Sequence, residues 1–124
     1  MERLVNVKHQ ATGQLLISGA RWGNGYFSRL RGLMFRHQLN AGEALILVEA
    51  RDSRTTASIH MFFVPFSIAV VWINNTGRVV DKVLAEPWRP FYAPRAPARY
   101  TLETHPEFLD KVVVGDELVF ENLS

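Results

Sequence analysis

Apolar residues alternate with polar ones, or run together for a few positions, in several short stretches of this chain. Such patterns are typical of β-strands. Residues 2–8 and 14–18 lie on either side of the break Ala11-Thr12-Gly13 and predict a β-hairpin. The apolar run from Glu43 to Glu49 predicts a short buried strand, and the segment RDSRTT after it predicts a polar connection.

The most apolar stretch of the chain is SIHMFFVPFSIAVVW, at residues 58–72. We expect two strands here, at residues 57–63 and 67–73. Pro65 marks a bend or an edge between them, because proline cannot donate a hydrogen bond within a central strand. The turn residues Asn74-Asn75-Thr76-Gly77 then predict a hairpin that returns through residues 78–85.

Two segments carry helical signals. An apolar stripe from Tyr26 to Met34 has the spacing of one helical face, which predicts a short helix at about residues 25–34. The sequence Thr104-His105-Pro106-Glu107 matches a capping box, in which the threonine oxygen accepts a hydrogen bond from the backbone of Glu107. It predicts a second short helix that ends near Asp110.

The rest of the second half predicts a surface loop and two further strands. The segment EPWRPFYAPRAPARY, residues 86–100, holds four of the six prolines, and we expect it to be an ordered loop. Residues 100–103 and 117–121 predict strands, the second of them after the turn Gly115-Asp116.

Many short strands, turn signals between them and only two short helices predict a mainly β fold. We expect residues 1–124 to form a small single-domain β-sandwich or a partly open β-barrel. Either architecture can bury both faces of the apolar runs at 43–49 and 67–73. An α+β fold is the alternative, if the helix at 25–34 packs over one sheet.

The composition of the chain excludes several kinds of site and partner. The 124 residues include no cysteine, which excludes disulfides and cysteine-ligated metals. A formal charge of +2 is short of a nucleic-acid footprint, so we expect no nucleic-acid partner. No segment reaches the ~18 apolar residues of a membrane span. The first residues show no signal peptide, so we expect a cytoplasmic location, unless a trimmed precursor carried an export signal.

His60 is the polar residue that stands out in the apolar stretch. Alternation along a strand would place His60 and Phe62 on one face and Met61 on the other. A buried imidazole needs hydrogen-bond partners, so His60 is either a structural residue bonded to the backbone or a donor or proton carrier at a pocket wall. His60 and Met61 are therefore candidate ligand-binding residues.

Four further side chains are candidates for ligand binding. Arg31 and Arg36 could hold a carboxylate or a phosphate, although a charged outer helix face is the simpler interpretation. Trp88 and Arg95 could stack on a ligand, although loop aromatics that fold back onto the domain are the simpler interpretation. The histidines lack metal-ligand spacing and the carboxylates lack catalytic pairing, so we expect no metal, no cofactor and no catalytic residue.

Several elements, in order along the chain, resemble a family known as domain of unknown function 192 (DUF192). They are Arg31-Gly32-Leu33-Met34-Phe35-Arg36, Met61, Gly77-Arg78-Val79-Val80, Glu86-Pro87, Tyr100-Thr101-Leu102-Glu103 and Gly115-Asp116. The resemblance covers about residues 20–120 and implies a single-domain β fold. It implies membership in a family of bacteria and archaea, and we expect a bacterial protein. It implies no established activity.

The chain departs from the family pattern in its apolar stretch. Where members read like W-M-K-N-T and then I-P-L-D, this chain has His60-Met61-Phe62-Phe63-Val64 and Phe66-Ser67-Ile68-Ala69. Apolar residues thus replace a lysine, an asparagine, a threonine and an aspartate. If those polar groups form a site in relatives, this chain lacks much of it, and His60 is the polar candidate that is left.

We therefore expect a non-catalytic binding or accessory module for a small molecule or a protein. Its pocket should lie near His60, Met61 and the loop from Trp88 to Arg99. Two alternatives stay open. One is a small enzyme that uses His60 as acid or base, with Arg31 or Arg36 holding an anionic substrate. The other is a structural interaction domain with a large exposed apolar patch.

Overall fold

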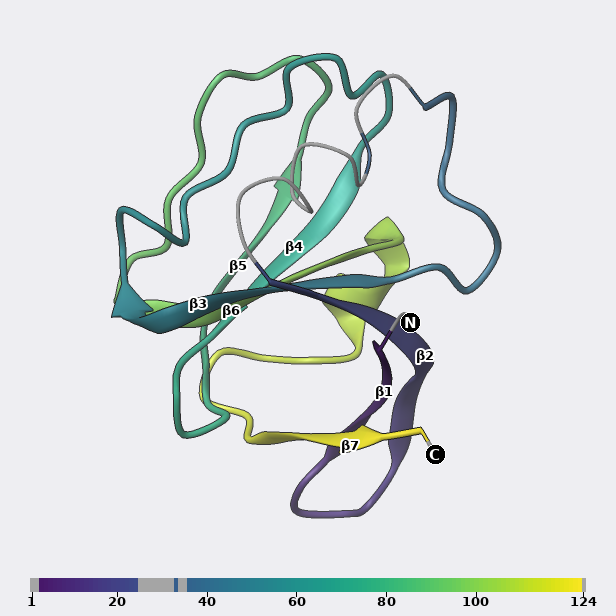
Figure 1. The fold of residues 1–124 in the computed structure, drawn as a ribbon, viewed down its shortest axis with the longest axis vertical. Helices are drawn as coiled ribbons and strands as arrows, with labels where there is room; N and C mark the ends of the chain where they lie inside the picture. Colours follow the sequence, from purple (N-terminus) through teal and green to yellow (C-terminus); the bar gives the residue numbers. More distant parts are fainter. Residues whose placement is uncertain (1–2, 25–32, 34–35, 124) are drawn as a thin grey trace.

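The computed structural model describes residues 3–24, 33 and 36–123, and these form seven strands and one short 3-10 helix (Figure 1). In chain order they are β1 (Arg3–His9), β2 (Leu15–Asn24), β3 (Leu45–Ser53), β4 (Ile68–Ile73), β5 (Val79–Ala85), β6 (Ala98–Thr104), η1 (Pro106–Asp110) and β7 (Leu118–Asn122). The mainly β class predicted from the sequence is confirmed.

All seven strands belong to one curled sheet, in the order β5-β4-β6-β3-β2-β1-β7. Neighbouring strands are antiparallel except β2 and β3, which run parallel. The two edges of the sheet meet at one end only, where Arg78 forms an isolated bridge with Glu117. The architecture is thus the partly open barrel, and the described residues form no second sheet of a sandwich.

Gly77 makes the closure of the barrel possible. Its carbonyl accepts a hydrogen bond of 2.8 Å from the N–H of Leu118 at the start of β7. A Cβ on Gly77 would lie 2.6 Å from the carbonyl oxygen of Leu118, and its φ of +91° belongs to the left-handed region. Only glycine satisfies both conditions without a shift of the backbone.

One hydrophobic cluster fills the inside of the curled sheet, and we call it the inner cluster. It consists of Val5, Val7, Ile17, Ala20, Ala44, Ile46, Ala69, Val71, Ile73, Val79, Leu102, Phe108, Val112 and Leu118. The short helix η1 contributes Phe108, so η1 closes part of this interior. Lys82 on β5 holds the end of η1 in place, since its Nζ donates to the carbonyls of Leu109 and Val112 at 2.6 and 2.8 Å.

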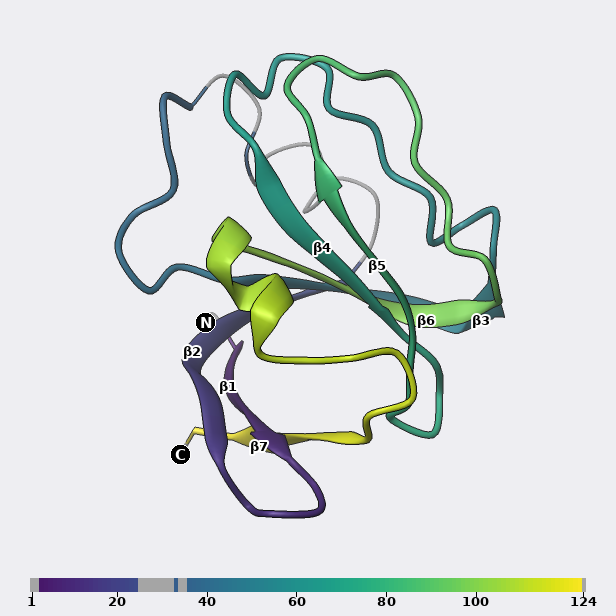
Figure 2. The same cartoon turned by 180° about the vertical axis from the view of Figure 1, so that it is seen from behind.

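A second hydrophobic cluster, the outer cluster, lies on the other face of the sheet. It consists of Leu33, Leu39, Ala57, Ile59, Met61, Val64, Ile68, Val70, Trp72, Ala85 and Ala98. All six residues of β4 are buried, because alternate side chains of this strand enter the two clusters. The outer cluster is covered by the loops at 54–67 and 86–97, which run side by side in Figures 1 and 2.

The hairpins at 2–18 and 67–85 are confirmed, as is the loop between β5 and β6. The strand predicted at 57–63 is wrong. This segment makes one isolated bridge, between Ile59 and Tyr92, and then turns where the N–H of Val64 donates to the carbonyl of Met61. Its alternating burial arises because a loop packs on a sheet, which buries Ile59 and Met61 as a strand would.

The capping box predicted at Thr104 is also wrong. Thr104 is the last residue of β6, and its hydroxyl donates to the carbonyl of Glu43 at 2.8 Å. The N-cap position of η1 is His105, which makes no side-chain capping hydrogen bond. Thr104 thus makes a tertiary contact instead of capping the helix.

The helix predicted at about 25–34 falls almost entirely outside the described residues. Within the described part of the chain, the structure contains no helix long and apolar enough to cross a membrane.

Candidate functional site

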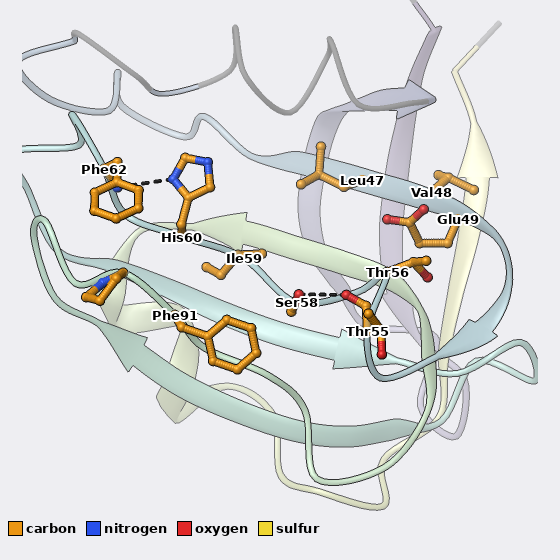
Figure 3. A pocket seen from close by; sticks show the side chains of 11 residues that line it. Leu47, Val48, Glu49, Thr55, Thr56, Ser58, Ile59, His60, Phe62 and Phe91 are labelled. Carbon is orange, nitrogen blue, oxygen red and sulfur yellow. Dashed lines mark hydrogen bonds between the residues drawn. The ribbon is translucent and has the colours of Figure 1, made fainter.

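A cleft of about 480 Å³ lies between β3 and the two loops that cover the outer cluster (Figure 3). It is lined by Leu47, Val48, Glu49, Thr55, Thr56, Ser58, Ile59, His60, Phe62, Pro90 and Phe91. Volumes of roughly 300–1,000 Å³ are typical of small-molecule sites.

The two ends of the cleft differ in chemistry, as the view in Figure 3 shows. Phe62 and His60 form an aromatic end, and the ring of Phe91 lies apart from them, nearer Ser58 and Thr55 in this view. Glu49 and three hydroxyl residues lie toward the other end, which we call the hydroxyl end. Within the described lining there is no arginine and no lysine.

Backbone hydrogen bonds between the two loops hold the aromatic end together. Ile59 and Tyr92 exchange N–H···O=C bonds of 2.9 and 3.0 Å. The N–H of Met61 donates to the carbonyl of Arg89 at 2.8 Å, and the carbonyl of Met61 accepts from the N–H of Trp88 at 3.0 Å. The loops therefore pair like a short ribbon, and this ribbon places His60 and Phe91 on the same cleft.

The buried indole of Trp72 fixes the first loop to the sheet. Its Nε1–H donates to the carbonyl of Ala57 at 2.8 Å, where the hydroxyl of Thr101 also approaches at 3.4 Å. Both donors belong to the sheet, on β4 and β6. These donors satisfy the carbonyl of Ala57, which is buried and needs hydrogen-bond partners. They thereby hold the segment that leads into the cleft against the sheet.

His60 is half-buried at the aromatic end of the cleft. Its ring lies 5.2 Å from the ring of Phe62, centroid to centroid, and its Nδ1 accepts a hydrogen bond of 3.2 Å from the backbone N–H of Phe62. The backbone of Phe62 thus holds the imidazole ring in one orientation at the cleft.

Glu103 is a site residue that the sequence reasoning did not single out. This carboxylate lies on β6, is only 7% exposed, and borders a cavity of about 20 Å³ together with His60 and Met61. Its burial has no local signal in the sequence, since Thr101 and Thr104 beside it are polar as well.

Arg36 forms a bidentate ion pair with Glu43 outside the cleft. Its two terminal nitrogens lie 2.6 Å from the two carboxylate oxygens of Glu43, which also accepts the backbone N–H of Asn40 at 2.9 Å. The hydrogen bonds from Arg36 lower the pKa of Glu43 to about 2. This pair fixes the connection that carries Leu39 into the outer cluster.

The other predicted candidates lie at separate places. The side chain of Met61 is buried in the outer cluster beneath His60. Trp88 is exposed and stacks on Phe63. Arg95 is exposed, and its backbone N–H donates to Asp81. Arg31 lies outside the described residues. Among the described residues, no group of three or more His, Asp or Glu side chains could hold a metal ion.

The model of the DUF192 family, described as an uncharacterized ACR, matches residues 8–120. The chain belongs to this family. UPF0127 proteins are similar to it: the one from Thermococcus sibiricus is 35% identical over 91% of this chain and 73% of its own length. The one from Pyrococcus furiosus is 34% identical over 83% of this chain and 87% of its own length. These relatives are archaeal and contradict the expectation of a bacterial protein.

Two crystal structures share the fold of this DUF192 chain. A Sinorhizobium meliloti protein, described as a candidate transcription regulator, has a TM-score of 0.80 at 18% identity, over 97% of this chain and 94% of its own. A Novosphingobium aromaticivorans protein of unknown function has a TM-score of 0.74 at 16% identity, over 94% of this chain and 83% of its own. At such identities the likeness establishes the fold alone.

The departures from the DUF192 pattern fall on both faces of the sheet. Ala69, at the position of the family's aspartate, is fully buried in the inner cluster, away from the cleft. Phe62 and Phe63, at the positions of a lysine and an asparagine, are exposed beside the cleft. In this member, aromatic rings therefore stand where polar side chains are expected.

Proposed function

We propose that this domain is a binding module that holds one small molecule in the cleft between β3 and the two loops. The observation that carries this proposal is the lining, with aromatic rings at one end and hydroxyl groups at the other. The ligand that fits is uncharged or nearly so, with a flat apolar part and a polar end.

The aromatic rings of the lining support a flat group as the apolar part. Phe62 and Phe91 are both large exposed side chains that line the cleft, so a ligand ring would remove their faces from water. Leu47 and Ile59 supply buried apolar surface between them. Because the described lining holds no arginine or lysine, a strongly anionic ligand finds no counter-charge there.

His60 supplies orientation in this proposal. Its Nδ1 is engaged by the backbone of Phe62, which fixes the ring as part of the cleft wall. A few polar groups held in place among apolar side chains set the orientation of the ligand in many small-molecule sites.

Indole, a flat neutral molecule with one N–H group, is a suitable probe of the cleft. We expect its titration into isotope-labelled protein to shift NMR signals of Leu47, Ile59 and His60, with smaller changes elsewhere. His60→Ala and Phe91→Ser should each weaken the binding about five-fold, since each removes one contact worth about 1 kcal/mol. Native mass spectrometry of freshly purified protein should reveal a retained small molecule.

His37→Ala is the matched control, because His37 is exposed and does not line the cleft. Its affinity for indole should equal that of the wild type, and all variants should keep a cooperative unfolding transition. Shifts spread evenly over the surface, or equal effects of His37→Ala and His60→Ala, would contradict the proposal. Loss of cooperative unfolding in His60→Ala would show instead that the histidine is structural.

The enzyme alternative requires an arginine close to His60. Arg36 is engaged by Glu43 and does not line the cleft, and Arg31 lies outside the described residues. This alternative stays a prediction, as do the cytoplasmic location and the expected lack of a nucleic-acid partner. The description of the Sinorhizobium meliloti protein as a candidate transcription regulator finds no support in this cleft, whose described lining lacks the basic residues of a nucleic-acid site.

A further inference from the structure

The hydroxyl end of the cleft is rich in hydrogen-bond acceptors. Glu49 is the one Asp, Glu, Lys or Arg side chain in the described lining, and an ionised carboxylate accepts hydrogen bonds but donates none. In the view of Figure 3 this carboxylate lies between Leu47 and Thr56, within the lining. A carboxylate can accept several hydrogen bonds at once, so a ligand can share it with other donors. The hydroxyl end therefore carries a negative charge.

Ser58 adds a second acceptor at this end. Its hydroxyl donates to the backbone carbonyl of Thr55 at 2.6 Å, which uses the hydroxyl proton within the loop. The Ser58 oxygen has no second proton to donate, so toward a ligand it can serve only as an acceptor. The hydroxyls of Thr55 and Thr56 can accept as well as donate. A ligand group that carries several donors, such as an amino group, matches this end best.

The aromatic rings of the lining favour the same kind of ligand. Phe62 and Phe91 are 43% and 63% exposed, and both line the cleft. The ring of Phe91 lies toward Ser58 and Thr55 in Figure 3, so the lining brings an aromatic face toward the hydroxyl end. The face of an aromatic ring carries partial negative charge, and it attracts an ammonium group as well as a second flat ring.

Positive charge near the cleft is directed away from its lining. Arg54 donates to the carbonyl of Pro94 at 2.9 Å, and Arg99 donates to the backbone carbonyl of Glu49 at 2.9 Å and to the Oδ1 of Asn75 at 2.8 Å. Neither arginine lines the cleft. The formal charge of the whole chain is +2, which disfavours a cation in general. A preference for a cation must therefore come from the lining itself.

We propose that the ligand of this cleft is an aromatic amine, a flat ring joined by a short chain to one primary amino group. This rests on the proposed binding function and names the class of its ligand. The ring packs on the aromatic side chains of the lining. The ammonium group donates to the carboxylate of Glu49, with the oxygen of Ser58 as a second acceptor at the same end. Hydrogen bonds between charged partners are stronger than neutral ones, so this contact sets the preference among ligands.

Three molecules with the same indole ring test the proposal on the wild-type chain. Tryptamine carries an ammonium group, indole carries no charge, and indole-3-acetate carries a carboxylate. In calorimetric titrations we expect tryptamine to bind about five-fold more tightly than indole, and indole-3-acetate to bind about five-fold more weakly than indole. Raised salt should reduce both differences, because it screens charges.

Glu49→Gln removes the charge of the cleft and keeps the shape of the side chain. The ratio of the tryptamine affinity to the indole affinity should fall from about five to about one in this variant. Glu107→Gln is the matched control, since it removes the same charge from an exposed residue of η1 that does not line the cleft. It should keep the ratio of the wild type.

The outcomes separate this proposal from the binding function on which it rests. Equal binding of tryptamine and indole by the wild type, or an equal fall of the ratio in both variants, would overturn the aromatic amine and leave the binding function in place. If the wild type binds none of the three molecules, both are overturned. If Glu49→Gln loses its cooperative unfolding, the order of the three affinities in the wild type still decides.

Discussion

The inner and outer clusters share the strand β4 but are enclosed in different ways. Strands surround the inner cluster, and continuous backbone ladders and the bridge at Arg78 and Glu117 tie them together. Irregular loops cover the outer cluster, and a few hydrogen bonds such as that from Trp72 to Ala57 hold them. Regions covered by loops open more easily than regions enclosed by ladders. Stability and candidate function are therefore separated onto the two faces of one sheet.

The location of the cleft agrees with this separation. Apart from Val48, which packs against the inner cluster, the described lining residues are Leu47 and Glu49 of β3 and residues of the two loops. Loops carried by a rigid scaffold can change in sequence without loss of the fold. Phe62 and Phe63 lie in such a loop and are exposed, so the barrel does not depend on their side chains.

Gly77→Ala should have the largest effect, because it acts on the closure of the inner cluster. The new Cβ meets the carbonyl of Leu118 at 2.6 Å and is strained at a φ of +91°. We expect a loss of about 2–4 kcal/mol in the free energy of unfolding, measured with urea. Gly13→Ala is the control, since Gly13 has a φ of +73° and no atom within 4 Å of the added Cβ. Equal losses in the two variants would show that the close approach does not matter.

Val71→Ala and Val70→Ala compare the two clusters directly. Both valines are fully buried neighbours on β4, but Val71 enters the inner cluster and Val70 the outer one. The cost of a cavity depends on how well its surroundings collapse. We expect the free energy of unfolding to fall by about 2–3 kcal/mol in Val71→Ala and by about 1 kcal/mol in Val70→Ala. The loss is smaller in Val70→Ala because the loops over the outer cluster can relax into the space.

Native-state hydrogen exchange separates the two valine variants further. Val70→Ala should speed exchange mainly in residues 57–66, through local opening of the loops, whereas Val71→Ala should speed it throughout the sheet. The same cost and the same exchange pattern in both variants would show that the clusters form one cooperative core.

The ion pair of Arg36 and Glu43 should give a smaller effect than Gly77→Ala or Val71→Ala, and one that depends on pH. The folded pKa of Glu43, about 2, lies below the ordinary 4.5, so the stabilisation is complete above about pH 4.5 and is lost as the pH falls through 2. We expect the ion pair to contribute roughly 1–2 kcal/mol to the free energy of unfolding after solvent screening. Arg36→Gln should remove most of this pH dependence in urea unfolding between about pH 6 and about pH 2. An unchanged pH profile in that variant would contradict the assignment.

The sequence predicted the elements that are specified locally. The hairpin from Ile68 to Ala85 follows from two apolar runs around Asn74-Asn75-Thr76-Gly77, and the structure has it. The parallel pairing of β2 with β3 could not be predicted, because it joins strands across a connection of 20 residues, from Gly25 to Ala44. When alternate residues of a loop are buried, as Ile59 and Met61 are, the loop has the same apolar pattern in its sequence as a β-strand.

The candidate site was predictable to a smaller extent. His60 stood out as a polar residue in an apolar stretch, and the structure places it on the cleft. The lining also includes Leu47 from β3 and Phe91 from the second loop, and their meeting with the first loop depends on the pairing of Ile59 with Tyr92. Such tertiary pairing leaves no local signal. The exposure of Trp88 likewise depends on a turn whose positive φ no sequence rule indicated.

The pairing of β1 with β7 has a consequence for the order of folding. Residues 3–9 lie beside residues 118–122, so the first strand meets one of its two partners only when the last strand is present. Contacts between such distant residues slow folding, because the chain must lose the entropy of a long loop before they form. During synthesis, β1 and β2 can pair early. The edge of β1 that pairs with β7 stays unpaired until the end of the chain has been made. The unpaired edge of this early hairpin is thus the part of the nascent protein most open to pairing with other chains.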